Sequence, residues 1–119
     1  MLTRIIDECE AFIAGDNTTI KEILHPYKED LEIRYSLAHA SLKEGKASIP
    51  HRLKTSEVYY ILNGKGVMHI DDESNEVSSN HSVYIPPNAL QYIQNTGDSE
   101  LTFLCIVDPA WREEDEEIL

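Results

Sequence analysis

Residues 45–64 read GKASIPHRLKTSEVYYILNG, and residues 80–95 read NHSVYIPPNALQYIQN. Both stretches contain short runs of β-branched and aromatic residues, bounded by glycine, proline or asparagine. Such runs are typical of strands that end in tight turns. Because alternate residues of a strand point to opposite faces, His51 and Leu53 are expected to share a face. The two stretches therefore predict strands that carry polar residues into a folded sheet.

The same pattern continues through most of the chain. Short β-rich runs alternate with turn residues over 31–42, 57–63, 67–70, 82–87, 90–95 and 101–107. The connections are too short for crossover helices, so the strands should pair in an antiparallel manner. Regularly spaced short strands favour a sandwich or barrel. We therefore expect an all-β domain over residues 30–119.

Residues 1–29 follow a different pattern. Leu2, Ile5, Ile6 and Cys9 have helical spacing, and Thr19 with Glu22 forms a possible capping box. These features predict a partly helical N-terminal extension that packs on the barrel. Residues 113–117 are all acidic, and such a run is typical of a solvated tail.

Length and charge restrict the class of protein. A chain of 119 residues fits one domain, and a net charge of −12 repels nucleic acid and anionic lipid surfaces. The N-terminal segment lacks the pattern of a secretory signal, so the cytoplasm is the expected location. We expect a small-molecule ligand and neither a nucleic acid nor a membrane as partner.

Strand parity also predicts a site. It places His51, Glu57 and Gln91 on inward faces, where one nitrogen and two oxygens could bind a divalent metal ion. Alternatively, these side chains form a hydrogen-bonded polar cluster, as buried polar groups generally do. The apolar residues expected to line a pocket beside them, or simply to fill the barrel, are Leu53, Tyr59, Ile61 and Ile93.

The spacing of these residues resembles the two sequence motifs of the cupin family. The first cupin motif is Gly-x5-His-x-His-x3–4-Glu-x6-Gly, and the second is Gly-x5-Pro-x-Gly-x2-His-x3-Asn. The corresponding residues here are Gly45, His51, Leu53, Glu57 and Gly64, then Asn80, Pro86, Asn88, Gln91 and Asn95. The resemblance covers about residues 33–108 and implies a double-stranded β-helix, or jelly roll, with a site in the barrel mouth. Segments such as EVYYILNGKG are similar to small cupins grouped with mannose-6-phosphate-isomerase-like proteins.

The departures from the motifs bear on function. A cupin metal centre uses three histidines and one glutamate, whereas here Leu53 and Gln91 replace two of the histidines. A carboxamide is a weaker ligand for Zn, Fe, Mn or Ni than an imidazole, so the resemblance implies an incomplete metal site. Asn80 and Asn88 replace two glycines, and asparagine is the side-chain-bearing residue that best tolerates a positive φ.

Several functions remain open at this point. One is a cupin that binds a small metabolite, such as a sugar or a carboxylate. The alternative is a metal-dependent isomerase, epimerase or dioxygenase-like enzyme that uses His51, Glu57 and Gln91 as ligands. In a metal-free enzyme, Glu57 would act as a general base. A purely structural domain with a vestigial pocket is a third possibility.

The remaining aromatic residues and histidines suggest an interface and surface positions. The resemblance implies a homodimer, whose interface could contain Tyr60, Tyr84, Tyr92 and Trp111. His25 and His81 are expected on the surface, and His69 is expected to face outward. His39 is expected on a packing or outer face.

Overall fold

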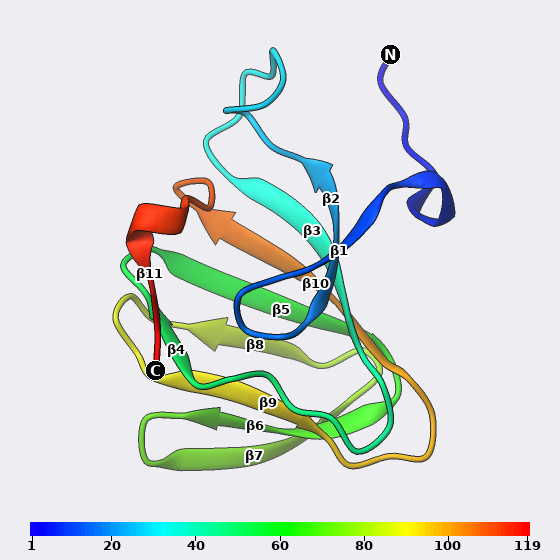
Figure 1. The fold of residues 1–119 in the computed structure, drawn as a ribbon, viewed down its shortest axis with the longest axis vertical. Helices are drawn as coiled ribbons and strands as arrows, with labels where there is room; N and C mark the ends of the chain where they lie inside the picture. Colours follow the sequence, from blue (N-terminus) through cyan, green and yellow to red (C-terminus); the bar gives the residue numbers. More distant parts are fainter.

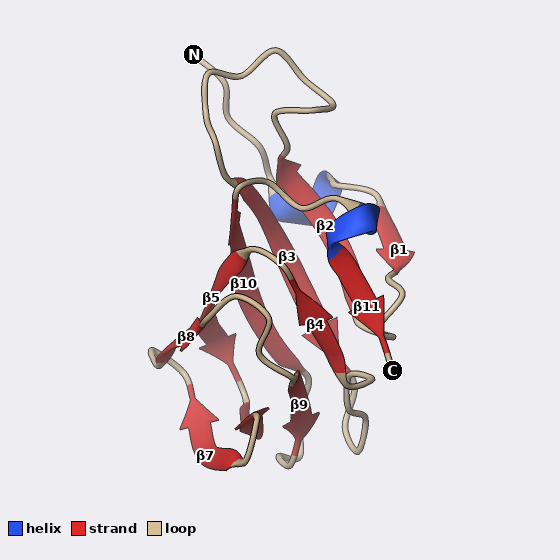
Figure 2. Cartoon of the chain, turned by 90° about the vertical axis from the view of Figure 1, so that its left-hand side faces the viewer, coloured by secondary structure: helices blue, strands red, loops and turns tan.

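The computed structural model describes all residues from 1 to 119, and they form two antiparallel sheets (Figures 1 and 2). The first sheet has six strands, in the order β1 (Ala11–Ile13), β2 (Thr19–Leu24), β3 (Ser36–Leu42), β10 (Leu101–Asp108), β5 (Ser56–Asn63) and β8 (Ser82–Ile85). The second has five, in the order β11 (Glu116–Ile118), β4 (His51–Leu53), β9 (Gln91–Asn95), β6 (Lys65–Ile70) and β7 (Glu73–Ser78). The all-β jelly-roll barrel expected from the sequence is thus confirmed.

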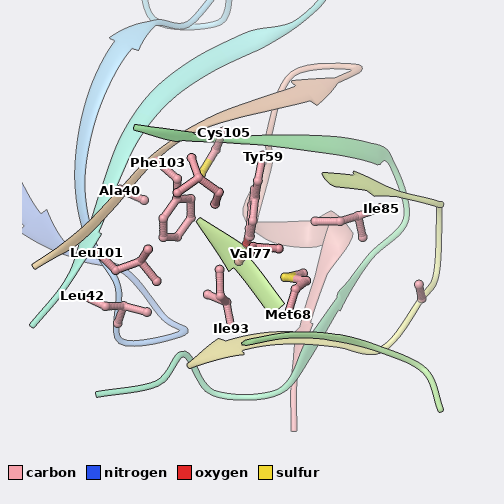
Figure 3. Packing of buried hydrophobic residues seen from close by; sticks show 12 residues of the cluster. Ala40, Leu42, Tyr59, Met68, Val77, Ile85, Ile93, Leu101, Phe103 and Cys105 are labelled. Carbon is pink, nitrogen blue, oxygen red and sulfur yellow. The ribbon is translucent and has the colours of Figure 1, made fainter. Parts of the chain in front are cut away.

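The core lies between the two sheets and is built by strand alternation (Figure 3). In β10, every second residue from Leu101 to Val107 is buried, while the residues between them are partly exposed. The ring of Phe103 is fully buried and packs against the ring of Tyr59, with the two ring centroids 4.5 Å apart. The alternation therefore places apolar residues inside the barrel, as period-two patterning requires.

The four turn positions of the two motifs all adopt the left-handed backbone conformation. The φ angles are 76° at Gly45, 88° at Gly64, 71° at Asn80 and 68° at Asn88. The prediction that asparagine preserves these turns is therefore confirmed. Gly64 is constrained further, because a Cβ atom there would lie 2.9 Å from the carbonyl oxygen of Glu100.

The helices expected near the N-terminus are not formed. Only a single 3-10 turn, Ile6–Glu8, is present, and the residues of the expected second helix form β2. This strand pairs with β3 from Thr19↔Ser41 onward, so the hydrogen bonds of a sheet replace those of a helix. Thr19, Ile20 and Ile23 are β-branched and favour a strand, whereas the capping-box pattern is a weak local signal.

The acidic C-terminal segment is not simply a solvated tail. After the 3-10 turn Glu113–Asp115, it forms β11, which pairs with β4 through Glu116↔Leu53 and Ile118↔His51. Its neighbour across the barrel mouth is the turn between β1 and β2, where Gly15 would place a Cβ atom 3.6 Å from side-chain atoms of Glu116 and Ile118. The β1–β2 turn and the C-terminal strand therefore meet at the barrel mouth. None of the helical segments has the length and hydrophobicity that crossing a membrane demands.

Candidate functional site: a cavity at the barrel mouth

A cavity of about 220 Å³ lies inside the barrel mouth. It is bounded by strands β1 to β5 and β10, the β1–β2 turn, and the C-terminal segment. Most of the lining is apolar, including Phe12, Ile20, Leu53, Phe103 and Val107. The polar and titratable groups that line it are Asp16, Thr18, Glu22, Ser36, His51, Glu57, Tyr59, Cys105, Trp111 and Glu116.

Glu57, Gln91 and Tyr59 form a buried hydrogen-bonded chain. The side-chain amide of Gln91 donates to Glu57 Oε1 at 3.1 Å, and the Tyr59 hydroxyl donates to Gln91 Oε1 at 3.1 Å. Gln91 is fully buried and does not line the cavity. Both its amide oxygen and its amide nitrogen are hydrogen-bonded within the protein. Gln91 therefore positions Glu57 and Tyr59.

His51 lies beside this chain, and its ring is oriented by a backbone group. Its Nδ1 donates to the carbonyl oxygen of Ile49 at 2.7 Å, which leaves Nε2 directed toward the cavity. Nε2 lies 3.6 Å from Oδ2 of Asp16, in the β1–β2 turn. The other oxygen of Asp16 accepts from the backbone amide of Thr18 at 3.1 Å and from its hydroxyl at 2.6 Å. The turn thus fixes a second polar group opposite His51.

Burial changes the acid–base chemistry of Glu57. Desolvation raises the pKa of this carboxyl group from 4.5 to about 8, and repulsion from Asp16 and Glu116 adds to the increase, while the bond from Gln91 opposes it. Glu57 therefore holds a proton near neutral pH. Burial also raises the pKa values of Tyr59 and Cys105 well above their ordinary values, so both remain protonated.

The C-terminal segment adds two residues that sequence reasoning did not place in the site. Glu116 and Trp111 both line the cavity, and the indole Nε1 of Trp111 donates to Glu116 Oε2 at 3.3 Å. Partial burial raises the pKa of Glu116. Trp111 thus lines the barrel mouth, and its suggested place at a subunit interface stays a prediction. Glu116 pairs with Leu53 across β11 and β4, so these two side chains share a face of the sheet. No local sequence pattern reveals this pairing.

The four predicted pocket residues occupy two different places. Leu53 and Tyr59 line the cavity. Ile61 and Ile93 are fully buried and do not line it; both belong to the core cluster. The barrel is therefore filled at its centre and hollow only toward the mouth.

The other histidines lie away from the cavity. His69 faces outward and stacks on Tyr92, with ring centroids 4.1 Å apart. His39 is half-buried on β3, and desolvation lowers its pKa. His81 is exposed, as expected, but His25 is only 4% exposed, because its Nε2 is hydrogen-bonded to the carbonyl oxygen of Trp111 at 2.9 Å. The expectation that His25 is a surface residue was wrong.

Comparison with known proteins agrees with this architecture. Residues 38–107 match the family model described as Cupin domain, so the chain belongs to the cupin family. It is 40% identical over 116 residues to the uncharacterized protein MJ1618 of Methanocaldococcus jannaschii. The alignment covers 95% of this chain and 90% of that protein.

Two solved structures share the fold at low sequence identity. A predicted oxalate decarboxylase from Thermotoga maritima has a TM-score of 0.79 at 22% identity, covering 92% of this chain and 99% of that one. A structure of Streptomyces PAC13 with uridine has a TM-score of 0.79 at 18% identity, and the match covers 100% of this chain and 90% of that one. At these identities the likeness shows the shared fold.

The residues of this chain do not fit a cupin metal centre. Leu53 offers no donor atom, and the amide oxygen of Gln91 is already bonded to the Tyr59 hydroxyl. No three His, Cys, Asp or Glu side chains are arranged to hold a metal ion.

Proposed function

We propose that this protein binds a small, largely apolar molecule in the cavity at the barrel mouth, and that binding needs no metal ion. The observation that carries this proposal is the cavity itself, which combines an apolar lining with a few polar groups near its mouth. That combination is typical of sites for small organic ligands. The solved structure of PAC13 with uridine is consistent with a small-molecule site in a barrel of this fold.

The volume sets the size of the ligand. An engineered cavity of about 150 Å³ holds one benzene molecule, so by proportion about 220 Å³ accommodates roughly nine non-hydrogen atoms. Glu57 is 94% buried, and its Oε2 atom makes no hydrogen bond within the protein. Thr55 Oγ1 is the one enclosed side-chain atom without a partner, so Oε2 of Glu57 is accessible from the cavity and available to a ligand group that forms a hydrogen bond. The ligand is therefore small and carries at least one polar group.

A cavity-filling substitution tests the proposal. Ala38 lines the cavity on β3, and Ala38→Leu would add three carbon atoms to the space that a ligand needs. Ser41→Leu adds a larger apolar side chain to the same strand at a position that does not line the cavity. In a fragment screen by ligand-detected NMR, binders of the wild type should lose binding in Ala38→Leu and retain it in Ser41→Leu. Equal binding by all three proteins would overturn the proposal.

A second candidate function is metal-free acid catalysis in the same cavity. The observation that favours it is the raised pKa of Glu57, about 8, because a carboxyl group that holds its proton near neutral pH can serve as a general acid. The sequence suggested a general base at this position, whereas the buried environment supports proton donation. If a compound found in the screen is turned over, Glu57→Gln should abolish turnover and preserve binding; undiminished turnover would exclude this role.

We also propose a homodimer formed through the outer face of the six-stranded sheet. Three large apolar side chains are exposed on neighbouring strands there: Tyr60 (38%), Leu62 (39%) and Tyr84 (65%). Aromatic residues are enriched at the centres of interfaces. Sedimentation equilibrium should give a dimer that Tyr84→Lys dissociates; a monomeric wild type at 100 μM would contradict this assembly.

A further inference from the structure

The negative charge of the cavity lining is concentrated on two carboxylates, Asp16 and Glu116. Its lining includes four carboxyl side chains and neither lysine nor arginine. Of the four, Glu57 holds a proton near neutral pH, and Glu22 is paired with Lys28, whose Nζ lies 2.5 Å from Glu22 Oε1. Asp16 and Glu116 have no lysine or arginine partner. Such a cavity disfavours an anionic ligand, because no lysine or arginine lines it to offset the desolvation of a carboxylate or phosphate.

His51 and Asp16 provide a second and independent observation. His51 is 98% buried and its Nδ1 donates to Ile49, so the neutral form of the ring presents the lone pair of Nε2 to the cavity. No hydrogen bond satisfies Nε2 within the protein, and none satisfies Oδ2 of Asp16. These two acceptor atoms lie 3.6 Å apart. A ligand nitrogen about 2.9 Å from each could donate one N–H to each of them.

Trp111 and Glu116 extend this arrangement along the cavity. The indole N–H of Trp111 holds one oxygen of Glu116, so the carboxylate is fixed with its other oxygen free to accept a hydrogen bond. The face of an indole ring also attracts a cation. The remaining lining, which includes Phe12, Leu53 and Phe103, suits an apolar group.

From these contacts we infer that the cavity binds a small organic amine in its cationic form, with the ammonium group at Asp16, His51 and Glu116 and the apolar body against the rest of the lining. This inference rests on the proposed ligand-binding function and narrows it to one chemical class. It also replaces the sugar or carboxylate considered from the sequence.

Three probes of nearly equal size separate charge from shape. Benzylamine, benzyl alcohol and benzoate each have eight or nine non-hydrogen atoms, and they are cationic, neutral and anionic near neutral pH. We expect titration calorimetry at pH 7 to give benzylamine an affinity at least about tenfold above that of benzyl alcohol, because a charge-assisted hydrogen bond is the stronger kind. Benzoate should show no binding up to 10 mM.

Matched variants test the residues. Asp16→Asn keeps an oxygen for the two bonds from Thr18 and removes the charge, so benzylamine should bind about tenfold more weakly, while benzyl alcohol changes less than twofold. Glu76→Gln, on the exposed side of β7, makes the same change in net charge away from the cavity and should leave both affinities unchanged. A circular dichroism melt confirms that each variant is folded.

The outcomes distinguish this inference from the function on which it rests. If benzyl alcohol or benzoate binds as tightly as benzylamine, and Ala38→Leu abolishes that binding, the cavity is a ligand site but the amine class is wrong. If Asp16→Asn leaves benzylamine binding unchanged, the proposed contact is wrong. If the three probes fail but fragments of other classes bind in the cavity, the amine class alone is refuted. If no compound binds there, both conclusions fail.

Discussion

Replacing Glu57 with glutamine should flatten the dependence of stability on pH. In the folded protein the pKa of Glu57 is about 8, against an ordinary value of 4.5, so the folded state binds more protons than the unfolded state between these values. Stability therefore falls as the pH rises through this window and is lowest above pH 8. The full pKa shift contributes about 5 kcal/mol to the free energy of unfolding at low pH, and about 4 kcal/mol of this contribution is lost between pH 5 and pH 9.

Glu57→Gln removes the titrating group and keeps the contact. Its side-chain oxygen can still accept the hydrogen bond from the Gln91 amide, so the variant should fold. Urea unfolding at pH 5, 6, 7, 8 and 9 gives the free energy of unfolding for the wild type and the variant. The wild type should lose about 4 kcal/mol more than the variant over this range.

A surface control separates this effect from the general repulsion of a chain with net charge −12. Glu76→Gln changes the net charge equally at an exposed position, so its curve should run parallel to that of the wild type. The comparison is the loss of unfolding free energy between pH 5 and pH 9. If this loss differs by less than about 1 kcal/mol between the wild type and Glu57→Gln, the inferred protonated state of Glu57 is refuted.

Three further substitutions test the barrel and its mouth. Phe103→Ala removes a fully buried ring that packs on Tyr59 and should cost about 3–5 kcal/mol in urea unfolding; a loss below 1 kcal/mol would contradict the described core. Asn88→Ala should cost about 1 kcal/mol because of the positive φ, while Asn88→Gly should be close to neutral, and equal effects would argue against this turn. Trp111→Phe removes the bond to Glu116 and should weaken benzylamine binding at least about threefold in calorimetry without lowering the melting temperature by more than a few degrees; unchanged affinity would place the indole outside the site.

Much of the fold could be predicted from the sequence because the relevant signals are local. The alternation in β10 and the positive-φ residues at Asn80 and Asn88 each depend on a few neighbouring residues. The N-terminal segment could not be predicted in this way, since β2 becomes a strand only by pairing with the edge of β3. Its apolar spacing is compatible with a helix until that edge is available.

The candidate site could be predicted from the sequence only in part, for the same reason. Strand parity placed His51 and Glu57 toward the interior, and both line the cavity. Asp16 and Glu116 come from the two ends of the chain, and only the pairing of β11 with β4 and the β1–β2 turn bring them there. An acidic run gives no indication that one of its members, Glu116, is partly buried at the barrel mouth. The polar end of the cavity is therefore a product of tertiary structure.

The central claim is that the barrel mouth binds a small ligand without a metal ion. The most direct test is the mapping of benzylamine-induced amide chemical-shift changes in protein that has been treated with a chelator. We predict changes centred on Asp16, Leu53 and Glu116, which disappear in Ala38→Leu. Changes confined to the outer face of the six-stranded sheet, or changes that appear only after a divalent metal is added, would contradict this claim.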